Sequence, residues 1–469
     1  MPSPEPNGDA PVVVAEPIPE THSKELYEHS KTFLSKTPAR EVIWLRIGTV
    51  GLILTLFYIA IPIMNSAGAV PDYKLNFLGK YLCFCMVGLG IDLIWGYTGI
   101  LSLSQALFFC IGGYAMAMHL SLPQGGGDVR PEYNNIPQFM FFNNVRQLPF
   151  FWKPFQSLTF SLLAGIGLPA LVASCFGFFV FRSRVRGVYF SIITQALAWG
   201  SWLLVSRNEM LLGGTNGLTN FYKPLTEQRS YIRASYLLTL TVLVLSYLLC
   251  RAITKSKLGR VLIAIRDKET RLYFAGYRPY AFKVFAFAVG AALAGIGGML
   301  YSPQVTIISP HNMRVEESIL MVIWVALGGR GRLWGAIFGT LLVSYMYAAL
   351  TSDMPSAWPF IEGGMFLAVV LILPEGIVGL WDELERGVTS YGFSQAGLVR
   401  YSCIIIALLV LSLFVMGEAL GIMPGWLQTV VIHSDRLANV QVKYLGLVII
   451  LLVCGVWRRL VHSSLAVRG

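Results

Sequence analysis

Charged residues are scarce in this sequence, and their scarcity decides the broad class of protein. Of the 469 residues, 13% are charged and 55% are hydrophobic, whereas soluble globular domains carry about 25% charged residues. Several apolar runs exceed the roughly 18 residues needed to cross the hydrocarbon core of a bilayer. We therefore predict an all-α, polytopic transmembrane protein in a lipid bilayer. We expect no nucleic-acid partner, although the formal net charge is +11.

Motifs for catalysis, nucleotide binding and metal binding are also missing. No G-x-x-x-x-G-K-[ST] phosphate loop occurs, and the glycine-rich segment 213–221 lacks the Lys-Ser/Thr ending of that loop. The seven cysteines lie in apolar segments without zinc-like spacing to histidine. No Ser-His-Asp set or catalytic carboxylate pair can be assembled. We therefore expect a chain that is not an enzyme and that binds no metal or cofactor itself.

The apolar segments divide the chain into a polar N-terminal tail (1–43), a core of about ten spans (44–380) and an extension with two further spans (381–469). The tail lacks the apolar stretch of a cleaved signal peptide. Most Lys and Arg residues fall on one side when both termini are placed in the cytoplasm. The predicted spans are residues 44–64, 76–95, 101–121, 158–181, 188–206, 235–253, 281–300, 316–328, 333–350, 360–377, 400–422 and 442–459.

Glycine interrupts two of these apolar regions. Segment 96–116 holds glycines and then Ser102, Ser104 and Gln105. Glycine lets the backbone leave the helix, and the freed polar groups are tolerated at membrane depth only where they line protein or a water-filled cavity. The alternative explanation is close helix packing through small residues. Segment 294–340 is also glycine-rich, with a predicted break at 302–304 and a short span, as an internal repeat would require.

Polar side chains inside apolar segments are our candidates for a solute path. Asp92 is a carboxylate within a predicted span, although its position near the cytoplasmic end also allows contact with water. Gln195 offers a donor and an acceptor, which suits an amide or urea-like solute, but a structural interhelical hydrogen bond remains open. The candidate path residues are Asp92, Tyr97, Thr98, Ser102, Ser104, Gln105, Thr194 and Gln195.

A basic, polar island at residues 254–280 separates two long apolar segments. Unsatisfied polar groups are costly inside a bilayer, so this island must be exposed to water. At helical spacing, four residues form one apolar stripe: Leu258, Val261, Leu262 and Ile265. We interpret the island as a cytoplasmic segment whose stripe docks on a soluble partner.

Six strings occur in an order that resembles the branched-chain amino-acid/urea ABC permease family, and they cover roughly residues 75 to 380. Within the family, the sequence is most similar to the larger permease subunit of the urea importer. The strings are DLIWGYTGILSLSQALFF, GVYFSIITQALAWG, LLGGTNGLTNF, SKLGRVLIAIRDKE, FAFAVGAALAGIGGMLY and VIWVALGGRGRLWGAIFGTLLV.

The resemblance implies a subunit of an ATP-driven importer for urea or short-chain amides in a bacterial inner membrane, working by alternating access. Its implied partners are a second permease subunit, two cytoplasmic ATPase subunits that bind the ATP, and a periplasmic solute-binding protein. By the same resemblance, SKLGRVLIAIRDKE matches the segment that couples the permease to the ATPase. The residues carried over as that contact are Gly259, Arg260, Ala264, Ile265, Arg266 and Asp267.

Three other functions remain open at this point. A branched-chain amino-acid permease of the same family is the nearest alternative. A stand-alone channel or ion-coupled transporter and an assembly subunit without a solute path belong to different classes. The extension after about residue 385 has no counterpart in the family.

Overall fold

The computed structural model describes residues 55–353, except for 128–135, 138, 141–144, 146, 184, 186 and 220–228, and a few positions between 360 and 377. The chain divides into two units, residues 1–62 and 63–469. In the first unit, the described residues form π-helix η1 (Leu56–Ala60) and begin α3 (Ile61–Ser66). The predicted N-terminal tail and C-terminal extension lie outside the described residues, as does most of the predicted span 360–377. The remaining helices and strands belong to the second unit.

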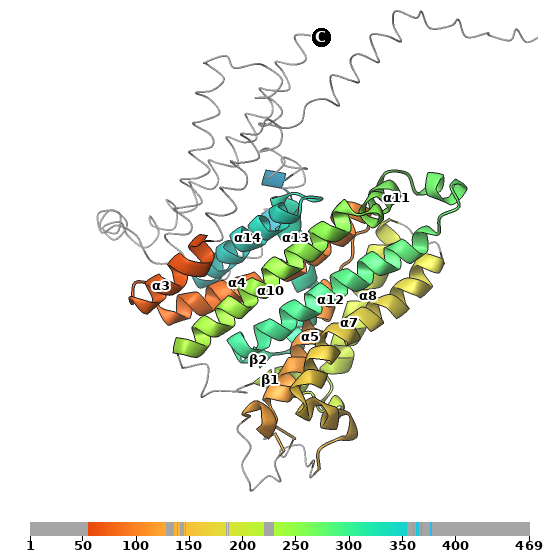
Figure 1. The fold of residues 1–469 in the computed structure, drawn as a ribbon. Coiled ribbons are helices and arrows are strands. Elements are labelled where there is room, and N and C mark those ends of the chain that lie inside the picture. Colours follow the sequence, from red (N-terminus) through yellow and green to blue (C-terminus); the bar gives the residue numbers. More distant parts are fainter. Residues whose placement is uncertain are drawn as a thin grey trace, which may run out of the picture. The chain divides into compact units, whose positions relative to one another are not determined.

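Long helices make up the described part of this unit (Figure 1). Five stretches are long and apolar enough to cross a membrane: Asp72–Gly96, Leu158–Arg182, Val188–Val205, Ser230–Lys255 and Pro279–Val305. This confirms the predicted all-α, polytopic class. The helices are α4 (Asp72–Ile91), its π-helical continuation η2 (Asp92–Gly96), α5 (Gln105–Leu120), α7 (Leu158–Arg182), α8 (Val188–Val205), α10 (Arg229–Lys255), α11 (Lys257–Phe274), α12 (Pro279–Val305), α13 (Val315–Gly328) and α14 (Leu333–Asp353).

Short elements connect the long helices. The 3-10 turns are η3 (Pro123–Gly125), η5 (Phe150–Gln156), η6 (Asn208–Met210), η7 (Gly214–Asn216) and η8 (Pro310–Met313). Strands β1 (Leu218–Thr219) and β2 (Ile307–Ile308) pair antiparallel, with Leu218 opposite Ile308. A Cβ at Gly217 would collide with the carbonyl oxygen of Ile308. The glycine-rich loop that precedes β1 therefore serves close packing against β2.

Helix α12 packs along α4, α5 and α7, and its glycines allow the close approach. Cβ atoms at Gly90 of α4 and Gly112 of α5 would collide with the backbones of Gly290 and Gly295 of α12. The predicted break at 302–304 is wrong, because α12 continues through Pro303 to Val305. Pro303 removes one helical hydrogen bond, but only two residues of α12 follow it, so a kink there redirects little of the helix.

The predicted interruption after Gly96 is confirmed. Helical structure ends at Thr98, Gly99 has a φ of 74°, and residues 99–104 are not helical before α5 starts. The freed backbone is satisfied by side chains of α8: Ser191 donates to the Leu101 carbonyl at 2.8 Å, and the Leu103 N–H donates to Thr194 Oγ1 at 3.1 Å. Irregular backbone inside a helical bundle is viable only with such partners.

Candidate coupling segment and solute path

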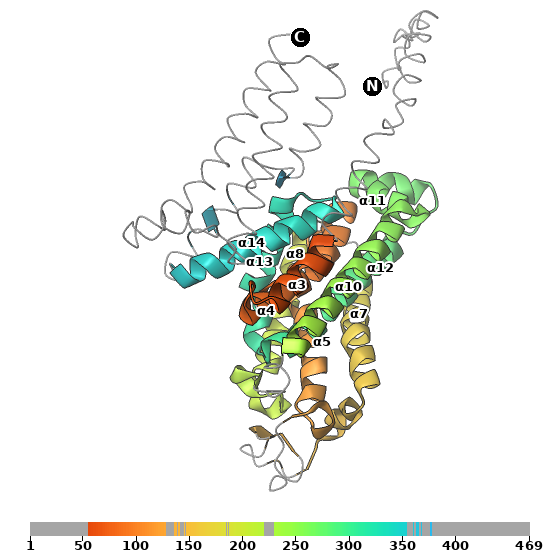
Figure 2. The same cartoon turned by 60° about the vertical axis from the view of Figure 1, so that its left-hand side comes forward.

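Helix α11 makes up most of the predicted basic island, and it lies at one end of the bundle, between α10 and α12 (Figure 2). Ser256 caps its N-terminus by accepting a hydrogen bond from the Leu258 N–H at 3.1 Å. At the corner with α10, a Cβ at Gly259 would collide with the Thr254 backbone, so this position requires glycine. The backbone of Lys268 is not helical (φ −152°, ψ 86°), so α11 consists of two parts joined at Lys268.

The apolar stripe of α11 faces the protein's own bundle. Leu262 and Ile265 are buried in a cluster with Leu93 of η2 and Ala286 of α12, whereas Leu258 is exposed. Our interpretation of the stripe as a surface for a soluble partner is therefore wrong for its central residues. Burying this apolar surface within the chain packs the first part of α11 against η2 and α12.

The outward face of α11 is polar and largely basic. Of the six predicted contact residues, Gly259 and Ile265 are buried and Ala264 is half-buried, whereas Arg260, Arg266 and Asp267 are exposed. The other exposed polar residues of this helix include Lys257, Lys268 and Thr270. The side of α11 that is turned to water therefore carries charged side chains.

Arg266 attaches the first part of α11 to the interrupted helix. Its Nη1 donates to the Gly96 carbonyl oxygen at 2.8 Å, and its aliphatic chain passes close to Gly99. Next to this bond, the Gly331 N–H donates to the Asp92 carboxylate. A Cβ at Gly96 would collide with both the Asp92 carboxylate and the Gly331 backbone. We call Asp92, Gly96, Arg266 and Gly331 the junction, because they join η2, α11 and the turn between α13 and α14.

A second attachment holds the other part of α11. Lys283 of α12 donates to Glu269 at 2.7 Å, and the two side chains are only 8% and 16% exposed. The Lys283 ammonium also lies 5.8 Å from the centre of the Phe181 ring. Removing one partner of a buried ion pair costs about 3–5 kcal/mol. We did not predict this ion pair, although a lysine within a predicted span is a signal that such a partner exists.

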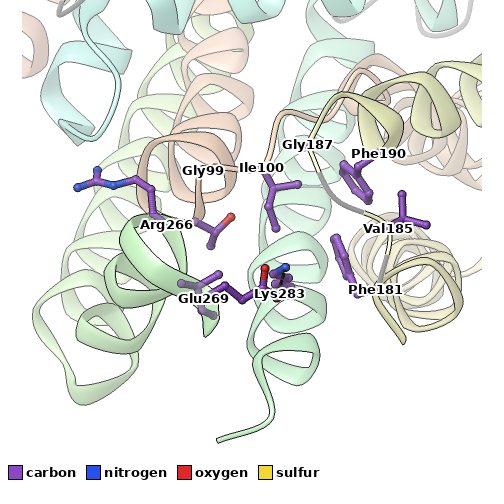
Figure 3. Close-up of a pocket in the computed structure, with 11 residues that line it drawn as sticks. Gly99, Ile100, Phe181, Val185, Gly187, Phe190, Arg266, Glu269 and Lys283 are labelled. Carbon is purple, nitrogen blue, oxygen red and sulfur yellow. Dashed lines mark hydrogen bonds and ion pairs between the residues drawn. The ribbon is translucent and has the colours of Figure 1, made fainter. Parts of the chain in front are cut away.

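A cavity of about 150 Å³ lies between the two attachments (Figure 3). Ile100, Phe181 and Phe190 line its apolar side, and Glu269 and Lys283 point toward each other at its polar side. The Arg266 side chain borders the cavity but directs its guanidinium away from it. Space is therefore available next to the point where α11 changes direction.

The structure brings four of the eight candidate path residues together where α5 starts: Ser102, Ser104, Gln105 and Thr194. The Ser102 and Ser104 hydroxyls are 3.0 Å apart, and Thr194 is fully buried against this segment. Gln105 is 1% exposed, and neither atom of its amide has a hydrogen-bond partner among the described residues. Ser318 of α13 closes the group by accepting from the Ala106 N–H at 3.3 Å.

The other four candidates lie elsewhere. Asp92 belongs to the junction, and Tyr97 packs against the cluster under α11. Thr98 is buried, donates to the Ile94 carbonyl at 2.5 Å and lines the cavity. Gln195 is exposed on α8, next to the buried Thr194.

Helix α8 is exposed over most of its length, with only 22% of its residues buried in this chain. Its exposed side carries Tyr189, Ile192 and Trp199 beside Gln195. An uncharged amide in a membrane-spanning helix is costly against lipid unless a partner covers it.

The fold is a bundle of membrane-spanning helices. It contains an interrupted helix with buried polar groups and a basic segment tied to that helix, which are features of a polytopic membrane permease. The family model for permease components of branched-chain amino acid transport systems matches residues 73–373, and the chain belongs to this family.

Curated relatives agree with this assignment. The high-affinity branched-chain amino acid transport system permease protein LivM of Salmonella typhimurium is 25% identical over 69% of this chain and 73% of its own length. A probable branched-chain amino acid transport permease protein LivM of Methanocaldococcus jannaschii is 27% identical over 55% of this chain and 75% of its own. The autoinducer 2 import system permease protein LsrC of Photorhabdus laumondii is 26% identical over 45% and 65%, respectively. No solved structure matches the chain.

Proposed function

We propose that this chain is one permease subunit of an ATP-driven importer and that a separate ATPase docks on the polar face of α11. The observation that carries the proposal is the Arg266–Gly96 hydrogen bond, because it links a water-exposed basic helix directly to the interrupted helix. The sequence has no phosphate loop of its own, so a partner must supply the energy of ATP hydrolysis.

The complete importer contains this chain, a second permease subunit, two cytoplasmic ATPase subunits and a periplasmic solute-binding protein. It lies in a bacterial inner membrane, with both termini of this chain in the cytoplasm. The exposed amide of Gln195 on α8 then faces the second permease subunit instead of lipid. Exposed Arg260 and Asp267 on α11 contact the ATPase.

Alternating access follows from the same connections. A displacement of α11 changes the position of Gly96 through Arg266, and the non-helical residues 99–104 follow because they continue the chain from there. This segment carries the hydroxyls and the amide at the start of α5. Movement of an interrupted helix past a fixed bundle opens the solute path to one side at a time.

The solute that we propose is an amino acid with a branched apolar side chain. The N-terminus of α5 lies beside Ser102 and Ser104, and although the Ala106 N–H already donates to Ser318, a helix N-terminus favours a carboxylate. The relatives named for branched-chain amino acids support the same solute. Urea or a short-chain amide is the second candidate, because the unpartnered Gln105 amide offers both a donor and an acceptor.

Reconstitution of the complete complex in proteoliposomes tests both parts of the proposal. The binding protein is supplied outside, ATP is enclosed inside, and uptake of radiolabelled leucine and urea is measured in parallel. We expect ATP-dependent leucine uptake. Urea uptake without leucine uptake would transfer the proposal to the second candidate. Uptake that continues without ATP or without the ATPase subunits would contradict an ATP-driven importer and favour a channel.

A further inference from the structure

We propose that Glu269 and Lys283 are positioning residues whose buried ion pair is the pivot of α11. The first part of α11, residues 257–267, swings about this pivot together with η2, against which Leu262 and Ile265 pack, and it carries the Arg266–Gly96 link with it. The inference rests on the proposed function, because an ATPase on α11 supplies the displacement.

The first argument is the position of the break in α11. Lys268 leaves helical geometry directly between Arg266 and Glu269. A continuous helix transmits a push to both attachments equally, whereas a break lets one part turn while the other stays in place. The break therefore separates an attachment that moves from one that does not.

The second argument is the difference in solvent access between the two attachments. The Glu269–Lys283 ion pair is 16% and 8% exposed, so water competes poorly for either charge. Arg266 is 42% exposed and donates to the Gly96 carbonyl oxygen, so this attachment lies at the surface of the bundle, where it can move. The buried attachment stays in place while the exposed attachment moves with the first part of α11.

The third argument is the cavity beside the break. Its volume of about 150 Å³ is bordered by Arg266 on one side and by Phe181 and Phe190 on the other. The cavity is partly open to the surface, where Arg266 and Gly187 are exposed. An open volume at this place lets residues of the first part change position without displacing the bundle.

Charge exchange tests the pivot in the complete complex. Glu269→Lys and Lys283→Glu each place two like charges together, and we expect solute uptake per ATP hydrolysed to fall roughly ten-fold. The double variant restores opposite charges, and its ratio should return to within about three-fold of the wild type. Copurification of the partner subunits confirms assembly for each variant. A double variant that assembles but stays as uncoupled as the single variants would overturn the pivot.

A cross-linking experiment keeps the test informative if the single variants fail to assemble. In Glu269→Cys/Lys283→Cys, a short bismaleimide replaces the lost ion pair, so we expect cross-linking to raise uptake. In Ile265→Cys/Phe190→Cys, whose side chains line the same cavity from α11 and α8, the same reagent fixes the part that should move to the bundle, so we expect cross-linking to abolish uptake. The four single-cysteine variants control for modification of native cysteines. A loss of uptake in the first pair with a gain in the second, or the same response in both pairs, would overturn the pivot.

The wild-type vesicles separate this inference from the proposed function. ATP-independent uptake by the wild-type complex would overturn the proposed function and the pivot together. ATP-dependent uptake by the wild type, with no effect of charge exchange or cross-linking at residues 269 and 283, would overturn the pivot alone.

Discussion

Glycines at 96–99 and glycines at 290–298 lie in neighbouring parts of the same bundle, yet they serve different purposes. Gly96 and Gly99 stand where the helix stops and the backbone turns toward α5. Gly290, Gly295 and Gly298 stand inside an unbroken helix and let neighbouring backbones touch it. The first region joins the basic segment to the polar side chains at the start of α5, and the second holds the bundle together.

The two purposes predict different consequences of adding a side chain. At Gly295 and Gly298, a larger residue should prevent folding, because the nearest neighbouring atoms are backbone atoms of packed helices. At Gly96, a larger residue should leave a folded protein that transports poorly, because the colliding atoms are the Asp92 carboxylate and the backbone of a turn at Gly331, which yield more readily than a packed helix.

The largest effect is expected for Gly298→Leu in α12. A Cβ at this position would collide with the Phe109 carbonyl oxygen, and backbone cannot move aside without separating α12 from α5. Overpacking costs about 1–3 kcal/mol where side chains yield, and more where only backbone is available. We expect loss of the folded protein, measured as the monodisperse yield after detergent extraction. Gly167→Leu on the exposed side of α7 is the matched control, because a Cβ there meets nothing within 4 Å. Equal yields of the two variants would contradict a packing role for the glycines of α12.

The next effect is expected for Gly96→Ala at the junction. The added methyl group would collide with the Asp92 carboxylate and the Gly331 backbone, so these groups must separate. We expect a normal folded yield but a fall of roughly ten-fold in ATP-driven uptake, in line with the 0.5–2 kcal/mol by which coupling residues act. Uptake and solute-stimulated ATP hydrolysis are measured on the same vesicles.

Gly200→Ala on α8 is the control for this variant, because a Cβ there meets nothing within 4 Å in this chain. If Gly96→Ala lost its folded yield together with its uptake, the distinction between the two glycine regions would disappear.

The sequence predicts the helices of this fold better than their contacts. The spans 158–181 and 188–206 agree with α7 and α8 to within one residue at each end, because long apolar runs fix both the length and the type of the element. The interruption after Gly96 was also predictable, because polar residues follow the glycines directly. Dense glycine followed by Pro303 gave a wrong break at 302–304, since glycine serves close packing as well as chain breaks and α12 continues through the proline.

The contacts within the site could not be predicted from the sequence, because they depend on how the helices pack. An amphipathic helix shows the same pattern whether its apolar side meets the protein's own bundle or a partner, so the inward direction of Leu262 and Ile265 was not predictable. Glu269 and Lys283 lie in different predicted elements, and only the turn after α11 brings them together. Thr194 is buried and its neighbour Gln195 is exposed. This difference depends on the rotation of α8 about its axis, which neighbouring helices determine.

The smallest effect on folding, and the one that bears most directly on the solute path, is expected for Gln105→Leu. Both amide atoms of Gln105 are buried without a partner among the described residues, and a buried polar group in that state costs about 1–3 kcal/mol. Replacing it with a similar-sized apolar residue should therefore raise thermal stability. If the amide binds solute during transport, uptake should fall even though stability rises, because the substitution removes the group that binds the solute.

Gln195→Leu is the comparison for this variant, because it removes the same group from an exposed position on α8. In this chain alone, we expect it to change stability little, since the Gln195 side chain is already exposed. Thermal unfolding followed by tryptophan fluorescence and uptake of leucine are measured for both variants. Higher stability with unchanged uptake in Gln105→Leu would remove Gln105 from the solute path and leave the break after Gly96 a purely structural feature.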